Sequence, residues 1–232
     1  MDEKMMTDFE RQRLTMVESQ LRPNEVTDTR LLAAMRALPR ERFVPLKLRP
    51  LAYMDEGIEV FPSIDGAPAR FLLAPMVLAR LVQLAAVEPQ DAVLDVGCAT
   101  GYSTAVLARL GRSVIGLEPE PELAEAARGT LRDLGIANAE IVEGALARGH
   151  PEAGPYDVIL LNGSVPELPE NLILQLKEGG RLAVVMANGA NSGSQGKAYL
   201  FVKVGGKASG LPHFDAGARP LPGFLPEPCF TF

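Results

Sequence analysis

The sequence is poor in the residues that build metal centres and disulfide frameworks. Among its 232 residues it has two cysteines, Cys98 and Cys229, and two histidines, His150 and His213. Two widely separated thiols imply neither a disulfide framework nor a cysteine-rich metal site, and two histidines are too few for a typical zinc or iron centre. We therefore expect no metal cofactor and a reducing, cytoplasmic environment.

Long hydrophobic runs and an excess of positive charge are also lacking. Residues 1–6 are acidic at their start and contain no apolar stretch of signal-peptide length. The most apolar segment, 71–87, is interrupted by Pro75, Arg80 and Gln83, so we expect no membrane partner. The formal net charge is −6, whereas a nucleic-acid-binding surface needs clustered lysines and arginines. We therefore expect no nucleic-acid partner either.

What the sequence does contain is a regular alternation of apolar runs and helix-patterned segments from residue 92 onward. The apolar runs predict strands near 92–97, 113–118, 139–143, 156–162, 181–187 and 199–202. The segments between them predict helices at 101–110, 120–134 and 167–177. Such alternation is typical of α/β proteins with a parallel sheet, and Gly205-Gly206 predicts an antiparallel hairpin at its end.

The first third of the chain has a different pattern. Apolar residues at helical spacing predict helices within 9–38, whereas 55–70 is rich in Gly and Pro and predicts an irregular lid or a short hairpin. Pro75 suits the first turn of a following helix. We therefore divide the chain into an N-terminal helical cap and lid, 1–75, and an α/β domain, 76–232, with a Pro-rich C-terminal tail.

The most informative segment is 91–118. An apolar strand leads into the turn 95–101, and a second apolar run ends at Glu118. Such strand–turn–helix units bind nucleoside cofactors where the strand meets the helix N-terminus. The glycines are spaced G-x-x-x-G, because Ala99 and Thr100 stand where further glycines would let the backbone approach a pyrophosphate. This spacing favours S-adenosylmethionine, and a nicotinamide dinucleotide is the alternative.

Two acids frame this predicted cofactor site. Asp95 can meet the cationic amino-acid end of S-adenosylmethionine, and Glu118 can accept hydrogen bonds from both ribose hydroxyls. The other expected cofactor contacts lie in the same turn or at the ends of strands: Gly97, Cys98, Ala99, Gly101, Tyr102, Ser103, Pro119, Gly144, Ala145 and Asn162. The expected fold is that of a class I S-adenosylmethionine-dependent methyltransferase: Rossmann-like, with a mostly parallel seven-stranded sheet, a terminal antiparallel hairpin and an N-terminal helical cap.

Several stretches, taken in order, resemble protein-L-isoaspartate O-methyltransferases. They are MVESQL at 16–21, VTDTRLLAAM at 26–35, PRERFVP at 39–45, LAYMD at 51–55, GYSTAVLA at 101–108 and LKEGGRL at 176–182. The resemblance covers roughly residues 10–187. It implies a monomeric cytoplasmic enzyme that methylates the free carboxylate of isoaspartyl residues in aged proteins.

The chain departs from this family's pattern at two places. The family has Thr-Ile-Ser-x-Pro before the helix that precedes the cofactor strand, but this chain reads FLLAP at 71–75. Leu73 therefore stands at the position of the substrate-contacting Ser, and Phe71 at that of the Thr. The family's Gly-Asp-Gly, whose Asp lies near the adenine, is replaced by VEGAL at 142–146, where Glu143 is the one acid.

The chemistry of carboxyl methylation leaves several functions open. A carboxylate with a pKa of about 4 is already anionic at neutral pH, so the reaction needs alignment and exclusion of water rather than a general base. Without a hydroxyl at Leu73, the candidates for the catalytic acceptor contact are Asn162 and Ser63, and Tyr53 and Asp55 could face the cleft. We keep three functions: isoaspartyl repair, methyl transfer to another small-molecule or peptide acceptor, and non-catalytic S-adenosylmethionine binding.

Overall fold

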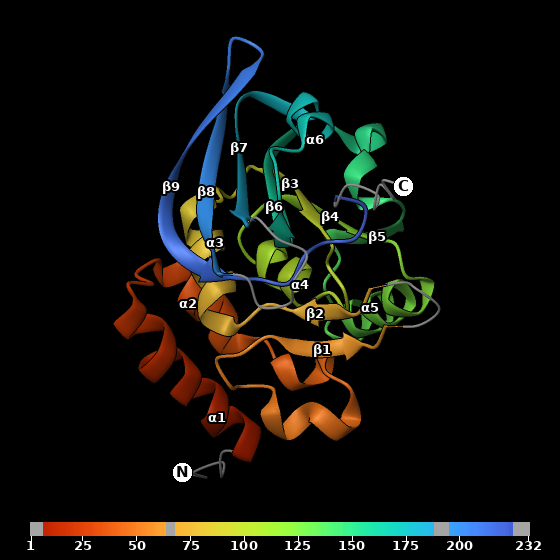
Figure 1. Ribbon diagram of the computed structural model, residues 1–232. Coiled ribbons are helices and arrows are strands. Elements are labelled where there is room, and N and C mark those ends of the chain that lie inside the picture. The colour runs from red at the N-terminus through yellow and green to blue at the C-terminus, as the bar shows by residue number, and fades with distance from the viewer. Residues whose placement is uncertain (1–6, 64–67, 188–194, 225–232) are drawn as a thin grey trace, which may run out of the picture.

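A seven-stranded sheet forms the centre of the computed structural model, which describes residues 7–63, 68–187 and 195–224 (Figure 1). Its strands are β3 (Ala92–Val96), β4 (Ser113–Glu118), β5 (Ala139–Glu143), β6 (Tyr156–Val165), β7 (Leu176–Met186), β8 (Gln195–Val204) and β9 (Lys207–Gly217). They lie in the order β5-β4-β3-β6-β7-β8-β9. The strands β3 to β7 pair in parallel, and β8 pairs antiparallel with both β7 and β9. The predicted mostly parallel sheet with an antiparallel end is confirmed.

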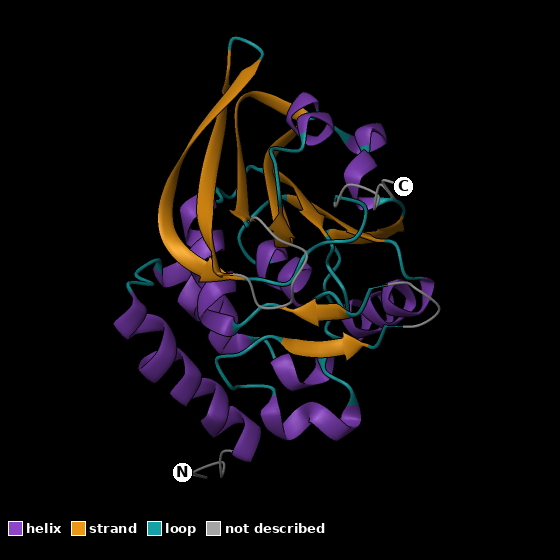
Figure 2. Cartoon of the chain, viewed as in Figure 1, coloured by secondary structure: helices purple, strands orange, loops and turns teal. Residues whose placement is uncertain are grey.

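Four α-helices accompany the sheet in the described part of this region: α3 (Pro75–Ala85), α4 (Tyr102–Ala108), α5 (Pro121–Asp133) and the short α6 (Glu170–Leu174) (Figure 2). Two 3-10 turns, Leu146–Arg148 and Pro151–Ala153, lie between β5 and β6. Successive residues of the central strands belong to two different hydrophobic clusters. Val93 and Val158 pack in the cluster that contains α3, α4 and α5, whereas Leu94 and Ile159 pack in the one that contains α6. Because side chains of a strand alternate between its faces, both faces of the sheet are covered.

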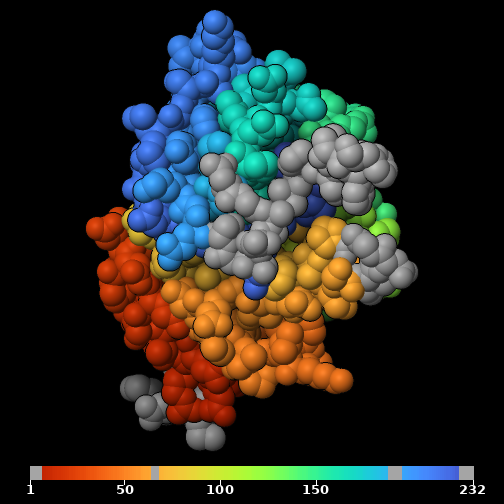
Figure 3. Space-filling model, viewed as in Figure 1, coloured from red at the N-terminus to blue at the C-terminus, as the bar shows by residue number. Residues whose placement is uncertain are grey.

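The N-terminal region consists of helical turns followed by a small hairpin. Its elements are α1 (Asp8–Met16), a π-helical turn (Val17–Leu21), α2 (Thr29–Ala37), 3-10 turns (Arg22–Asn24, Arg40–Phe43 and Leu46–Leu51), and the antiparallel strands β1 (Ile58–Phe61) and β2 (Arg70–Leu72). Met16 and Leu31 share a hydrophobic cluster with Leu81 of α3. Figure 3 shows this region as the red and orange lower part of the molecule, below the blue β8 and β9. The boundary at residue 75 stays a prediction.

The structure corrects several predicted element boundaries. The helix predicted over 167–177 is only α6, because the backbone from Leu176 onward already pairs with β6 as part of β7. The strand predicted at 199–202 is longer, because β8 pairs along its whole length with β9. Within the described ranges, no helix combines the length and the apolar character that crossing a bilayer requires.

Candidate active site

The turn between β3 and α4 has the backbone of a ligand-binding loop. Gly97, Ala99 and Gly101 all have positive φ, at 74°, 49° and 89°. Residues other than Gly are strained at positive φ, which explains the two glycines of the G-x-x-x-G pattern. A Cβ at Gly101 would also lie 3.0 Å from the Cβ of Ala127 on α5. The loop therefore holds a fixed shape at the carboxyl end of the sheet.

Asp95, in β3 just before this loop, accepts hydrogen bonds from three side chains. Its carboxylate is fully buried and accepts hydrogen bonds from Ser103 Oγ (2.7 Å), Thr104 Oγ1 (2.6 Å) and Asn162 Nδ2 (2.5 Å). Burial raises the pKa of Asp95 to about 6, against the opposing effect of these three donors. The structure thus brings together three of the predicted site residues, Asp95, Ser103 and Asn162. The amide of Asn162 also donates to Val96 O at 3.3 Å, so it is committed to the scaffold.

Glu118, at the end of β4, has a partner that the sequence did not suggest. Arg70 of β2 donates from Nε to Oε1 at 3.0 Å and from Nη2 to Oε2 at 2.9 Å. The side chains are 0% exposed for Glu118 and 2% for Arg70. The backbone N–H of Ala99 donates to the same carboxylate at 2.7 Å. The acid expected to bind ribose is therefore held by a buried, bidentate ion pair from the hairpin.

The surface of Gly97 is covered by side chains of this chain. A Cβ at Gly97 would lie 2.8 Å from Leu221 Cδ2, 3.0 Å from Arg70 Nη2 and 3.4 Å from Leu146 Cδ1. Leu221 follows β9 and is itself buried. The cavity that remains beside Gly97 has a volume of about 10 Å³, which is room for about one water molecule. It is lined by Arg40, Phe71, Leu72, Leu73, Leu78, Gly97, Cys98, Tyr102, Ser103 and Asn162.

Arg40 and Tyr102 form part of the wall of this small cavity. Arg40 is fully buried and donates to the backbone oxygens of Ala52 and Leu73, both at 2.8 Å. Its guanidinium carbon lies 4.7 Å from the ring centroid of Tyr102, whose edge meets the ring of Phe43. Burial lowers the pKa of Arg40 and raises that of Tyr102. Arg40 therefore fixes the backbone at Leu73, a role that sequence reasoning did not assign.

A second, open groove adjoins the small cavity at Leu73. It has a volume of about 390 Å³, and its walls include Asp55, Phe71, Leu73 and Arg219. The guanidinium of Arg219 lies 5.0 Å from the ring centroid of Phe71. Asp55 Oδ1 accepts the backbone N–H of Met76 at the start of α3, at 2.9 Å. The groove thus joins the hairpin, the N-terminus of α3 and the segment after β9.

The other predicted residues lie outside both cavities. Ser63 is exposed, and Glu143 is ion-paired on the surface with Arg128 at 2.9 Å. Pro119, Gly144 and Ala145 are half-buried or exposed at the ends of β4 and β5. Among the described residues, no group of three His, Cys, Asp or Glu side chains is arranged to hold a metal ion.

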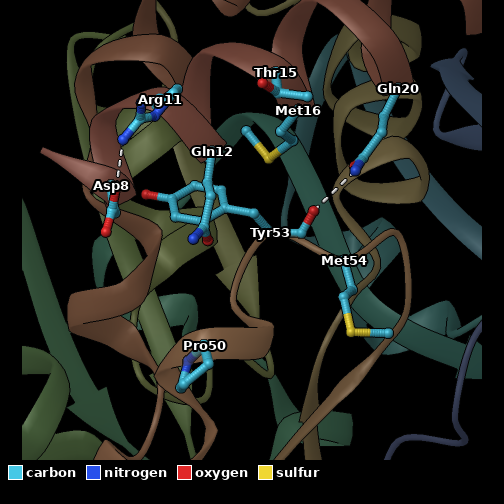
Figure 4. Close-up of a pocket in the computed structure, with 9 residues that line it drawn as sticks. All are labelled: Asp8, Arg11, Gln12, Thr15, Met16, Gln20, Pro50, Tyr53 and Met54. Atoms are coloured by element: carbon cyan, nitrogen blue, oxygen red, sulfur yellow. Dashed lines mark hydrogen bonds and ion pairs between the residues drawn. The ribbon is translucent and has the colours of Figure 1, made fainter. Parts of the chain in front are cut away.

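Tyr53 belongs to a different groove, of about 470 Å³, between α1 and the 3-10 turn at 46–51. Its hydroxyl donates to Glu41 and accepts from Arg13 Nε at 3.1 Å, and its backbone oxygen accepts from Gln20. Figure 4 shows the groove with its lining residues Asp8, Arg11, Gln12, Thr15, Met16, Gln20, Pro50, Tyr53 and Met54. Tyr53 is the one predicted site residue among them, and it ties together elements of the N-terminal region.

S-adenosylmethionine fits the polar groups of this site but not its present shape. The loop and the two acids supply the partners that the cofactor's amino-acid end and ribose require. Both acids already have partners, however, and the space beside Gly97 is occupied by Arg70 and Leu221. The cofactor would fit only after these two side chains moved.

Comparisons with known proteins agree with the order of motifs along the chain. The family model described as protein-L-isoaspartate(D-aspartate) O-methyltransferase matches residues 11–206. Protein-L-isoaspartate O-methyltransferase of Methanoculleus marisnigri is 38% identical over 172 residues, which are 74% of this chain and 76% of that protein. Protein-L-isoaspartate O-methyltransferase 2 of an Anaeromyxobacter species is 37% identical over 201 residues, 87% of this chain and 78% of its own length.

Solved structures agree with this result. A structure of a protein-L-isoaspartate O-methyltransferase superposes with a TM-score of 0.77 at 29% identity, over 92% of this chain and 67% of that one. A putative protein-L-isoaspartate O-methyltransferase from Plasmodium falciparum, in complex with S-adenosyl-L-homocysteine, has the same fold, with a TM-score of 0.73 at 21% identity over 89% of this chain and 96% of that one. The predicted family resemblance is confirmed: the chain belongs to the protein-L-isoaspartate O-methyltransferase family, whose members are S-adenosylmethionine-dependent methyltransferases.

Proposed function

We propose that this chain methylates the carboxylate of isoaspartyl residues in proteins or peptides, with S-adenosylmethionine as the methyl donor. The observation that carries the proposal, beside the family, is the open groove at Leu73. Its lining contains one cationic side chain, Arg219, two carboxylates, Asp55 and Glu56, and no Lys or His. From the family resemblance and the low cysteine content, we also propose that the protein works as a cytoplasmic monomer.

A groove without Lys or His is compatible with an acceptor that is already an anion, and Arg219 is the side chain that can bind it. A carboxylate needs no general base at neutral pH, so an acceptor site can work without a titrating side chain. S-adenosylmethionine supplies an activated methyl group when bound. The contribution of this chain is to hold the acceptor in line and to exclude water, and Phe71, Leu72 and Leu73 provide an apolar wall for the second task.

Arg219 is our candidate for the acceptor contact in place of a hydroxyl at position 73. Of the two candidates from sequence, Asn162 is bonded to Asp95 and Ser63 is exposed outside the groove. Arg219 is exposed, and its guanidinium lies against Phe71 in the groove wall. A guanidinium binds a carboxylate through two parallel N–H donors, a stronger contact than a single hydroxyl makes.

The test is methyl transfer from labelled S-adenosylmethionine to an isoaspartyl peptide and to its aspartyl counterpart. We expect label only in the isoaspartyl peptide. Arg219→Gln should raise KM for the peptide about tenfold to a hundredfold, because a charge-assisted hydrogen bond contributes about 1.5–3 kcal/mol. Arg36→Gln, an exposed arginine on α2, is the matched control and should leave KM unchanged. Equal labelling of both peptides would refute the specificity, and an unchanged KM in Arg219→Gln would refute the role of Arg219.

A second candidate function is methyl transfer to a different small-molecule or peptide acceptor. The apolar side chains of Phe71 and Leu73 in the groove favour it, because they offer a carboxylate no donor. Binding of S-adenosylhomocysteine without labelling of the isoaspartyl peptide would favour this second function.

A further inference from the structure

Arg70 holds Glu118 in the manner expected of the cofactor's ribose. A ribose diol offers two O–H donors to the two oxygens of one carboxylate, and Arg70 offers two N–H donors in the same way. The pair is shielded from water, so Glu118 cannot exchange Arg70 for solvent without movement of the hairpin side chain. A carboxylate engaged by a buried guanidinium is not available to a diol.

Leu221 covers Gly97 together with Arg70 and is fixed by its backbone. Ser164 N donates to Arg219 O at 2.8 Å, and Leu221 N donates to Ser164 O at 2.9 Å. Ser164 Oγ also donates to Ala218 O at 3.1 Å. A Cβ at Gly163 would lie 2.6 Å from Leu221 Cγ, so the segment 218–221 packs directly on the end of β6.

We propose that Arg70 and the segment 218–221 form an internal latch that keeps the cofactor pocket closed until the cofactor displaces it. The proposal rests on the proposed function in one respect, which is that Glu118 is the ribose-binding acid. In the closed form shown here, Arg70 covers Glu118 and Leu221 covers Gly97. The cofactor binds only an open form, so the apparent Kd equals the intrinsic Kd divided by the open fraction.

The latch makes an unusual prediction for mutagenesis: removing residues from the wall of the pocket should strengthen cofactor binding. Arg70→Ala frees Glu118, and Leu221→Ala uncovers Gly97, and neither change removes a group assigned to cofactor recognition. Arg70→Lys keeps the charge but loses the two-donor geometry, so its effect should lie between those of the wild type and Arg70→Ala.

The experiment is isothermal titration of the full chain with S-adenosylhomocysteine. We expect Kd to fall at least tenfold in Arg70→Ala, by an intermediate factor in Arg70→Lys, and at least threefold in Leu221→Ala. The matched controls are Arg42→Ala, which breaks an exposed ion pair with Asp133, and Leu211→Ala on the exposed face of β9. Both controls should bind as the wild type does. Circular dichroism checks that each variant is folded.

The outcomes separate this proposal from the proposed function. An unchanged or higher Kd in Arg70→Ala and Leu221→Ala overturns the latch, and so does failure of every variant to bind. If Arg70→Ala does not fold, Leu221→Ala and Arg70→Lys decide the question. Tighter binding in the variants without any methylation of isoaspartyl peptides would support the latch and refute the proposed function.

Discussion

The two cavities at the carboxyl end of the sheet are neighbours with opposite characters. The open groove at Leu73 has a volume of about 390 Å³, whereas the cavity beside Gly97 has about 10 Å³. Phe71, Leu72 and Leu73 line both, so one short segment separates an open site from a filled one. The difference lies beside Gly97, where the side chains of Arg70 and Leu221 occupy the space next to the glycine. A loop can therefore have the backbone conformation of a binding loop while side chains from other segments occupy the space in front of it.

The largest effect should come from Glu118→Ala, which removes the carboxylate that the closed pocket is built around. Arg70 would then be a buried cation without its ion-pair partner, and losing one partner of a buried pair costs about 3–5 kcal/mol. We expect a loss of this size in the free energy of unfolding, measured by urea denaturation, together with loss of S-adenosylhomocysteine binding.

A double variant sharpens this prediction. Arg70→Met with Glu118→Leu removes both charges and keeps the volume apolar, so most of the stability should return. Binding should not return, because the ribose acceptor is still missing. A loss below about 1 kcal/mol in Glu118→Ala alone would mean that the pair does not close the pocket.

The pH dependence of stability tests the buried carboxyl group of Asp95. The pKa of Asp95 is raised to about 6 in the folded protein, above the unfolded value of about 3.9. The folded state therefore binds the proton more tightly, and the contribution of Asp95 to stability decreases as pH rises from 4 to 6. Two pKa units correspond to up to about 3 kcal/mol.

The measurement is the free energy of unfolding of the wild type and of Asp95→Asn between pH 4 and pH 7.5. The difference between the two should change below pH 6 and stay constant above it. A constant difference over the whole range would contradict the raised pKa, and with it the view that burial outweighs the three donors at Asp95.

The smallest effect concerns the wall shared by the two cavities. Leu73 offers the acceptor no hydroxyl beside Arg219, our candidate donor in the groove. Phe71→Thr with Leu73→Ser should raise kcat/KM about tenfold or more, since satisfying a buried polar group is worth about 1–3 kcal/mol. The exposed Leu174→Ser on α6 serves as control. A kcat/KM in the double variant no higher than that of the native chain would show that the carboxylate needs no hydroxyl in addition to Arg219.

Local patterns in the sequence were sufficient to predict the sheet and the loop. Strand–turn–helix periodicity placed β3, α4 and β4, and the glycine spacing matched the positive φ angles of Gly97 and Gly101. The sequence also assigned Asp95 and Asn162 to one site, and the structure brings them together because the ends of the adjacent parallel strands β3 and β6 lie side by side.

The contacts that close the pocket could not be predicted in this way. Arg70 is separated by 48 positions from Glu118 and comes from a hairpin outside the sheet, and Leu221 comes from the segment after β9. No local periodicity records which side chain of a lid enters a cavity. The available signal was an arginine beside three apolar residues, which is unusual unless it has a buried acid as partner. The cofactor and acceptor contacts that the sequence assigned to individual residues stay predictions.

Arg219 and Leu221 are two residues apart on the segment that Ser164 holds against β6. If Leu221 leaves Gly97 by a shift of this segment, Arg219 moves with it, and the acceptor's cation reaches its final position only after the cofactor has entered. Steady-state kinetics would then follow a compulsory order, with the methyl donor as first substrate and the demethylated product as last to leave. A high concentration of acceptor peptide would trap the complex with that product and inhibit the enzyme uncompetitively with respect to S-adenosylmethionine.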